Sequence, residues 1–187
     1  MLIALRLSAQ TDEQLMKRAA RGNDHAFEEL YNRHARRLQG FFTRRLSGDA
    51  DLAADFTHDA FLRLYAARER YREGKDVRAW LFTIAYNLLK NHNKKPDTGD
   101  TQPSPSLVDE NCNLEVELDS ALFRDALRDA LRSLPEPLAT LFSLHYEEEL
   151  TVPQIAQIEE IPEGTVKSRL HNLMILIRKK LQHYDKE

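Results

Sequence analysis

The sequence predicts an all-α fold made of two small helical domains that are joined by a flexible acidic linker. Apolar side chains recur every three or four residues along most of the 187-residue chain, as they do on the buried face of a helix. Only 6 glycines and 7 prolines occur, and runs of β-branched residues are nearly absent, so strands are not expected. One internal segment interrupts the pattern. The predicted units are a first domain over residues 1–95, a linker over 96–113 and a second domain over 114–187.

Four helices are predicted in the first domain. Thr11 and Gln14 form a capping box that opens the first helix, and Gly22 ends it. The second helix is long and starts at Asp24, and the third starts at Asp51. The fourth has the most regular apolar stripe, which consists of Val77, Trp80, Leu81, Ile84, Ala85, Leu88 and Leu89.

The linker separates these helices from a second helical region. Residues 96–113 (PDTGDTQPSPSLVDENCN) contain three prolines and four acidic residues but little apolar content, which is typical of a flexible tether. Beyond it, leucines at helical spacing predict one helix that ends at Pro135 and another that starts at Leu138.

The last two predicted helices form a helix-turn-helix. Thr151 and Gln154 open a short helix that ends near Ile158, and a turn over residues 159–162 follows. The final helix has an apolar face made of Val166, Leu170, Leu173, Ile177 and Leu181. Its open face consists of Thr165, Lys167, Ser168, Arg169, His171 and Asn172. A helix with such a face fits the DNA major groove. The alternative is an ordinary αα-hairpin with a solvated basic face.

Basic and aromatic residues alternate between residues 63 and 95. Nine Lys or Arg occur there with three acids and five aromatic side chains. Such a surface suits single-stranded DNA, because aromatic rings stack on exposed bases while cations contact the phosphates. Trp80 lies on the apolar stripe and is expected in the core. Phe82 and Tyr86 lie one step off that stripe, so they are the expected base contacts.

One cluster, formed by Asp55, His58 and Asp59, has the chemistry of a metal or acid–base site. A metal hydrolase would need further ligands at the same point, and the sequence has neither a Gly-rich phosphate loop nor zinc-ligand spacing. The single cysteine, Cys112, suits a reducing compartment, and no apolar run approaches the length of a membrane span. We therefore expect a cytoplasmic protein without catalytic residues, cofactor, metal or membrane insertion.

The net charge of −3 conceals an uneven distribution. Residues 1–95 have 18 basic and 12 acidic side chains, whereas residues 96–120 have seven acidic side chains and no basic one. Residues 121–187 have 9 basic and 11 acidic side chains, and the basic ones gather in the final helix. The small negative net charge of the whole chain therefore does not exclude nucleic acid as a ligand.

Together these features resemble a bacterial extracytoplasmic-function RNA polymerase sigma factor. Residues 51–65 (DLAADFTHDAFLRLY) resemble the family's polymerase-binding helix, and residues 78–91 (RAWLFTIAYNLLKN) resemble its helix at the minus-ten promoter element. Residues 134–138 (LPEPL) and 161–171 (IPEGTVKSRLH) are similar to the family's most recognisable segments. The resemblance implies a region-2-like helical bundle in the first domain and a region-4-like helix-turn-helix in the second.

The resemblance also implies three groups of binding residues. The polymerase-binding group consists of Asp55, Phe56, Asp59 and Leu62. The group at the minus-ten element consists of Tyr71, Arg72, Lys75, Arg78, Phe82, Tyr86, Asn87 and Lys90. The group at the minus-thirty-five element consists of Glu163, Thr165, Lys167, Ser168, Arg169 and His171.

The implied function is that of a promoter-specificity subunit. It would bind core RNA polymerase at the β′ clamp helices and the β flap, recognise promoter DNA and help to open it. An anti-sigma factor is a further expected partner, and the apolar stretch over residues 172–175 is a candidate surface for it. The free chain should bind DNA poorly until polymerase separates the two domains. A free-standing helix-turn-helix regulator and a hydrolase using His58 and Asp59 are the alternatives.

The helix-turn-helix bend departs from the family pattern. The family usually has Leu-Gly there, and this chain has Glu159 and Glu160. A glutamate forced to positive φ costs roughly 1 kcal/mol or more, so either a glutamate bears this strain or the turn is reshaped.

Overall fold

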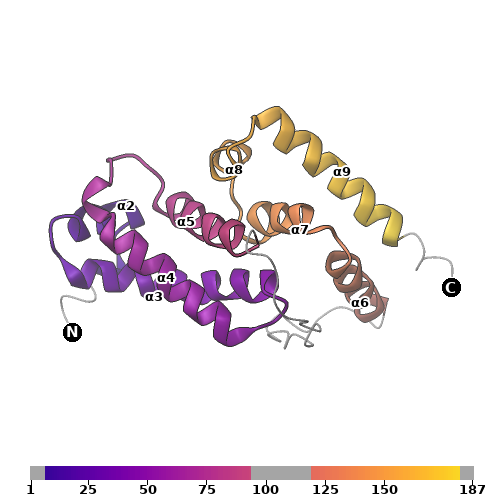
Figure 1. Cartoon of the computed structure of the whole chain (residues 1–187), viewed down its shortest axis with the longest axis horizontal. Coiled ribbons are helices and arrows are strands. Elements are labelled where there is room, and N and C mark those ends of the chain that lie inside the picture. The colour runs from indigo at the N-terminus through magenta and orange to yellow at the C-terminus, as the bar shows by residue number, and fades with distance from the viewer. Residues whose placement is uncertain (1–6, 94–118, 182–187) are drawn as a thin grey trace. The chain divides into compact units, whose positions relative to one another are not determined.

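The computed structural model describes residues 7–93 and 119–181. Every regular element in these two ranges is helical, and each range forms a compact unit (Figure 1). The all-α prediction is confirmed for them. The predicted linker, both predicted domain boundaries and Cys112 lie outside the described residues.

Unit 1, residues 7–93, contains a set of packed helices whose starts are fixed by local hydrogen bonds. Its elements are α2 (Asp12–Ala19), α3 (Asp24–Arg45), α4 (Ala50–Ala66), the 3-10 helix η1 (Arg68–Arg70) and α5 (Val77–His92). The predicted capping box is present, since the Gln14 N–H donates to Thr11 Oγ1 at 3.3 Å and the Thr11 N–H donates to Gln14 Oε1 at 3.1 Å. The third helix starts at Ala50 with Asp49 as its cap, slightly before the predicted Asp51.

Large apolar side chains fill the interior of unit 1. Helix α3 packs against both α2 and α4, and α4 packs against α5. The largest fully buried side chains of these helices are Leu15, Met16, Leu30, Leu38, Phe41, Phe42, Leu64, Leu81 and Phe82. Phe41 and Phe82 meet edge to face, with ring centroids 5.3 Å apart, which joins the C-terminal part of α3 to the first half of α5.

A polar network ties the first residues of unit 1 to α3. The Arg33 guanidinium donates to Asp12 Oδ1 and to Glu29 Oε1, both at 2.9 Å, and His34 Nε2 lies 2.6 Å from Asp12 Oδ2. The hydrogen bond from His34 lowers the pKa of Asp12 more than its burial raises it, and Arg33 lowers it further. Arg33 also donates to the backbone carbonyls of Leu7, Ser8 and Gln10. One side chain therefore holds a whole turn of backbone in place.

Unit 2 is built from shorter helices. Its elements are α6 (Asp119–Arg132), α7 (Glu136–Phe142), the π-helical turn η2 (Ser143–Glu147), α8 (Val152–Glu159) and α9 (Glu163–Leu181). Helix α7 starts at Glu136, two residues before the predicted Leu138, because proline is acceptable in the first turn of a helix and Pro137 therefore lies inside α7. At the start of α8, the Thr151 N–H donates to Gln154 Oε1 at 2.7 Å. Helix α9 packs against α6, α7 and α8.

Two glutamates of unit 2 adopt left-handed backbone conformations. Glu149 has φ 53° just before α8, and Glu160 has φ 58° directly after it. The second value shows that the bend between α8 and α9 keeps a left-handed residue and that Glu160 bears the strain. The backbone recovers part of the cost, because the Ile161 N–H donates to the Ala156 carbonyl at 3.0 Å and closes the end of α8.

Candidate nucleic-acid and protein interfaces

One face of α4 presents acidic and apolar side chains to solvent. Asp55 is exposed, and Leu62 has 54% of its surface accessible, which is unusual for a leucine on a packed helix. Asp59 lies on the same face and accepts two hydrogen bonds from Arg63, at 3.0 and 2.9 Å. Spacings of four and three residues place these side chains in one row. The structure therefore brings together three of the four predicted polymerase contacts.

The fourth predicted contact, Phe56, lies mostly inside the bundle. Its ring packs edge-on against Phe42 and against His92, with centroids 5.4 Å apart in both pairs. It remains partly exposed. Phe56 therefore supports the face from beneath more than it extends from it.

An exposed tyrosine beside this face is absent from the sequence prediction. Tyr31 on α3 is 39% exposed, and its ring lies 4.7 Å from that of Phe61, the residue before Leu62. The sequence places Tyr31 within the apolar stripe of its helix, so its exposure could not be inferred from periodicity. Only the angle at which α3 meets α4 sets the edge of that stripe.

The Asp55, His58 and Asp59 cluster does not form a metal site. Asp59 is paired with Arg63, and His58 is exposed. Within residues 7–93 and 119–181, no group of three His, Cys, Asp or Glu side chains is placed to hold a metal ion. The geometry of α4 thus gives the hydrolase alternative no support.

The prediction that Phe82 lies on the outer face of α5 is wrong. Its side chain is 2% exposed and packs against Phe41 in the core. Trp80, which was expected in the core, is half-buried and stacks on Tyr71, with ring centroids 6.1 Å apart and planes 18° apart. The apolar stripe of α5 is therefore shifted toward Phe82. The aromatic pair near the surface of this region is Tyr71 and Trp80.

The segment between η1 and α5 is fastened at several points. The Tyr71 hydroxyl donates to the Lys75 carbonyl at 2.8 Å, and Lys17 on α2 forms an ion pair with Glu73 at 2.7 Å. The hydrogen bond and charge of Lys17 lower the pKa of Glu73. Asp76 caps α5 by accepting from the Ala79 N–H at 2.8 Å. These contacts hold the segment against α2 and α5.

The remaining predicted minus-ten residues differ in how far their side chains are exposed. The structure places the side chains of Arg72 and Lys75 in the exposed segment, and those of Arg78, Tyr86, Asn87 and Lys90 half-buried along α5. Burial raises the pKa of Tyr71, and the nearby charges of Glu13, Glu73 and Asp76 raise it further, so its hydroxyl remains a donor. The group is a mixed aromatic and cationic surface that lacks Phe82.

The N-terminal half of α9 presents the predicted polar face. Glu163, Lys167, Ser168 and His171 are exposed, and Thr165 is half-buried. The opposite face is buried, as predicted, through Val166, Leu170, Leu173 and Ile177. The helix, turn and helix over residues 152–181 therefore have the arrangement that places a polar helix face in a DNA groove.

Arg169 differs from the other predicted residues of this face. Its Nη1 donates to Glu159 Oε2 at 2.9 Å, across the turn, and 39% of its side chain is exposed. Burial raises the pKa of Glu159, and Arg169 lowers it by less. Sequence periodicity could not identify this pair, because it joins residues on two different helices.

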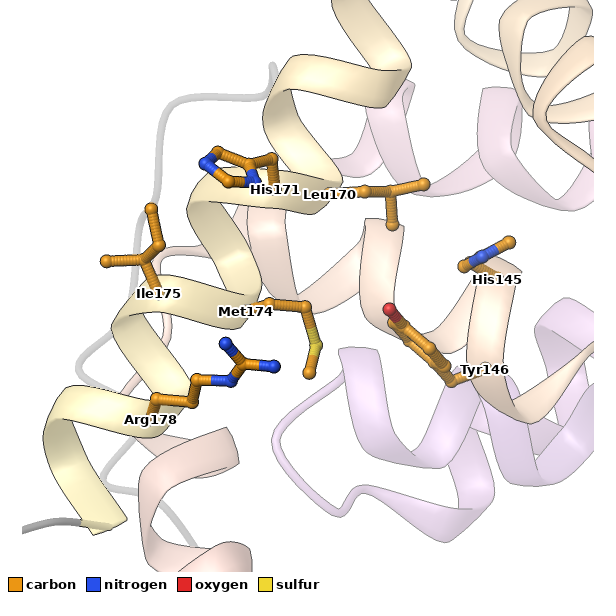
Figure 2. A pocket seen from close by; sticks show the side chains of 7 residues that line it. All are labelled: His145, Tyr146, Leu170, His171, Met174, Ile175 and Arg178. Atoms are coloured by element: carbon orange, nitrogen blue, oxygen red, sulfur yellow. The ribbon is translucent and has the colours of Figure 1, made fainter.

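A shallow hollow of about 320 Å³ lies between η2 and α9 in unit 2. Its lining residues are His145, Tyr146, Leu170, His171, Met174, Ile175 and Arg178. Leu170 and Met174 extend from α9 toward His145 and Tyr146 (Figure 2). Ile175 is 51% exposed and Tyr146 is 45% exposed. An apolar surface with a cationic rim thus adjoins the predicted DNA-facing residues.

Membrane insertion has no support in the described ranges. Within residues 7–93 and 119–181, no helix combines the length and the apolar composition needed to cross a bilayer.

Two family patterns match the two units. Sigma-70 region 2 matches residues 30–97, and Sigma-70 region 4 matches residues 124–174. In solved structures, the fold is similar to that of CnrH in complex with the cytosolic domain of CnrY, with a TM-score of 0.65, 20% identity, and coverage of 92% of this chain and 97% of that one. It is also similar to the sigma factor RpoE in complex with the anti-sigma factor NepR from Bartonella quintana, with a TM-score of 0.64, 22% identity, and coverage of 83% and 96%.

Curated relatives match over nearly the whole chain. The RNA polymerase sigma-H factor of Pseudomonas aeruginosa is 30% identical over 187 residues, which cover 94% of this chain and 96% of the relative. The ECF RNA polymerase sigma-E factor of Haemophilus influenzae is 30% identical over 188 residues, with coverage of 92% and 96%. With a region 2 bundle and a region 4 helix-turn-helix in the same order, this chain belongs to the extracytoplasmic-function RNA polymerase sigma factors, which are non-enzymatic transcription initiation factors.

Proposed function

We propose that unit 1 docks on the β′ clamp helices of core RNA polymerase through the exposed face of α4. Asp55, Asp59 and Leu62 form the contact row, and Tyr31 widens it onto α3. An exposed leucine in a row with two carboxylates suits a partner helix with apolar and basic side chains, because the apolar contact supplies affinity and the charges supply orientation. Phe56 acts from beneath by fixing the position of α4.

Opening of the minus-ten element is assigned to the surface around Tyr71 and Trp80. These rings are stacked on one another near the surface, and the same segment and the start of α5 contain Arg72, Lys75 and Arg78. A base that leaves the duplex loses stacking energy of a few kcal/mol, and an aromatic ring can replace part of it. Trp80 takes the place of Phe82 in this role, because Phe82 is buried.

Recognition of the minus-thirty-five element is assigned to the first half of α9. The contact residues are Glu163, Thr165, Lys167, Ser168, Arg169 and His171. Short polar side chains near the start of a helix suit base edges, and cations suit phosphates. The β flap would hold unit 2 on the polymerase, in the cytoplasm where the polymerase acts.

The face of unit 2 around the hollow is proposed as the site of an anti-sigma factor. The support is the exposed Ile175 and Tyr146 next to Met174, together with the fold likeness to two sigma factors solved in complex with such partners. Because His171 belongs both to the hollow and to the DNA-facing group, a bound anti-sigma factor would cover part of the promoter-binding surface.

The observation that supports the whole proposal best is the presence of two different recognition surfaces, one on each unit, in a chain that matches sigma factors over nearly its whole length. The test is run-off transcription from a library of random-sequence templates with purified core polymerase. We expect transcripts that start at defined positions only when the chain is present. Leu62→Asp should abolish both transcription and comigration with core polymerase, whereas the control Asn91→Asp, at an exposed position of α5 outside the three predicted groups, should preserve them. Tight binding of free chain to duplex DNA without such transcripts would support the free-standing regulator instead.

A further inference from the structure

A buried carboxylate lies behind one of the proposed DNA-contacting arginines. Glu159 is the last residue of α8, its side chain is 4% exposed, and it accepts a hydrogen bond from Arg169 at 2.9 Å. Arg169 belongs to the first half of α9 and is separated from Glu159 by the turn at Glu160. The pair therefore connects the two helices of the helix-turn-helix at the side where DNA would lie.

A contribution to the folding stability of unit 2 does not explain why a glutamate occupies position 159. A carboxylate loses hydration when it is buried, and at a helix C-terminus it also faces the negative end of the helix dipole. The pKa of Glu159 is raised by burial even though Arg169 lies beside it. The folded unit therefore tolerates this charge and gains little stability from it.

The arginine, by contrast, is well placed for a second contact. A guanidinium has five N–H donors in one plane, and the hydrogen bond to Glu159 engages only one edge of that plane. The side chain as a whole is 39% exposed, so Arg169 is accessible to a second partner. A guanidinium fixed at one edge keeps its other donors in a constant direction, which lowers the entropy lost when a phosphate binds.

We propose that Glu159 is a positioning residue for promoter recognition, which holds Arg169 so that the other edge of its guanidinium meets a phosphate of the minus-thirty-five duplex. This inference rests on the proposed DNA-binding role of α9. It adds a buried carboxylate behind the exposed contact residues of α9.

Whether replacement of Glu159 weakens or strengthens DNA binding distinguishes this proposal from a general electrostatic effect. Removing a negative charge near DNA strengthens binding if the charge acts only through the general field of the protein. If Glu159 acts by orienting Arg169, its removal weakens binding instead. Glu149, an exposed glutamate of unit 2 outside the proposed DNA-contacting group, supplies the acidic control.

The experiment measures binding of a labelled duplex by the chain assembled with core polymerase. The probe is a 30-base-pair duplex selected from a random pool with the wild-type holoenzyme. We expect Glu159→Leu, which keeps the volume but removes the acceptor, to weaken binding about tenfold. Glu159→Gln retains one acceptor oxygen and should lose only about threefold, whereas Glu149→Gln should bind as tightly as wild type or more tightly.

Two further measurements test whether Glu159 changes DNA affinity by way of Arg169. The slope of log affinity against log salt should fall by about 0.9, the value of one phosphate contact, in both Glu159→Leu and Arg169→Ala. In the Arg169→Ala background, Glu159→Leu should have no further effect on affinity. Thermal unfolding of unit 2 should be no earlier in Glu159→Gln than in wild type, so lower affinity cannot be attributed to lower stability.

The outcomes are separable. Equal or tighter binding by both Glu159 variants overturns the inference, as does an unchanged salt slope in Arg169→Ala, which would make the ion pair a purely structural brace. Failure of the wild-type holoenzyme to select any duplex would refute the proposed promoter-binding function itself. These results concern different variants and cannot be confused.

Discussion

The two units hold their exposed recognition segments in different ways. In unit 1 the segment before α5 is fastened by an ion pair to α2, a tyrosine hydroxyl bond and a helix cap, over a core rich in phenylalanine. In unit 2 the bend between α8 and α9 has the ion pair of Glu159 with Arg169 and the backbone hydrogen bond from Ile161, and it contains a glutamate at positive φ. More contacts hold the segment of unit 1 than the bend of unit 2. We therefore expect single surface substitutions to lower stability less in unit 1 than in unit 2.

The sharpest test of unit 1 compares two aromatic residues of α5. Phe82→Ala should lower the free energy of unfolding of unit 1 by about 3–5 kcal/mol, because it opens a cavity beside Phe41. Trp80→Ala should cost only about 1–2 kcal/mol, since Trp80 is half-buried. Denaturant unfolding followed by circular dichroism gives both values. A larger loss for Trp80→Ala would contradict the assignment of Phe82 to the core.

The network around Arg33 should be the next most sensitive. Arg33→Ala removes the donor to two carboxylates and three carbonyls, and we expect a loss of about 2–4 kcal/mol. Trp80, the only tryptophan of the chain, reports the unfolding of unit 1 by fluorescence. The exposed Arg70→Ala serves as the control and should change stability by no more than about 0.5 kcal/mol.

Asp12 should make part of this stability dependent on pH. Its pKa lies below the ordinary value of 3.8, so the folded chain binds this proton less readily than the unfolded chain. The ionised carboxylate therefore stabilises unit 1 above pH 3.8, and this contribution is lost as the pH falls through the lower folded value. Asp12→Asn should be about 1–3 kcal/mol less stable than wild type at neutral pH. The difference should shrink steadily in acid, and a difference that does not depend on pH would contradict the assignment.

The smallest expected effect is in the bend of unit 2. Glu160→Gly should stabilise α8 and α9 by about 0.5–1 kcal/mol, because glycine adopts φ 58° without steric strain. Gln157→Gly, at an exposed right-handed position of α8, should destabilise them by about 1 kcal/mol. Hydrogen exchange of peptides from these helices would measure both changes. Destabilisation by Glu160→Gly would mean that side-chain contacts of Glu160 outweigh the backbone strain.

Much of the fold follows from signals that act over a few residues. The capping residues Thr11 and Thr151, the break at Pro135 and the bend at Glu160 were each predictable, because caps and turns depend on nearby backbone groups. The inward face of α9 was predictable for the same reason. Its apolar residues keep one helical phase over five turns, so no neighbour was needed to locate them.

The candidate sites were less accessible to sequence reasoning. Phe82 and Trp80 lie on the two edges of one apolar stripe, and periodicity cannot say which edge a neighbouring helix covers. Tyr31 is exposed for the same reason on α3. The pairing of Arg169 with Glu159 requires a bend of particular geometry, which brings together side chains ten residues apart.

By itself the sequence determined the helical class, the helix starts, the helix-turn-helix and the membership of a sigma factor family. Those properties depend on local hydrogen bonding and on the period of the α-helix, and short segments of sequence determine both. Only the tertiary structure decided that Phe82 is core, that Trp80 stacks on Tyr71 and that Arg169 is held by a buried carboxylate. Burial and ion pairing depend on which helices meet and at what angle, and packing in three dimensions sets that angle.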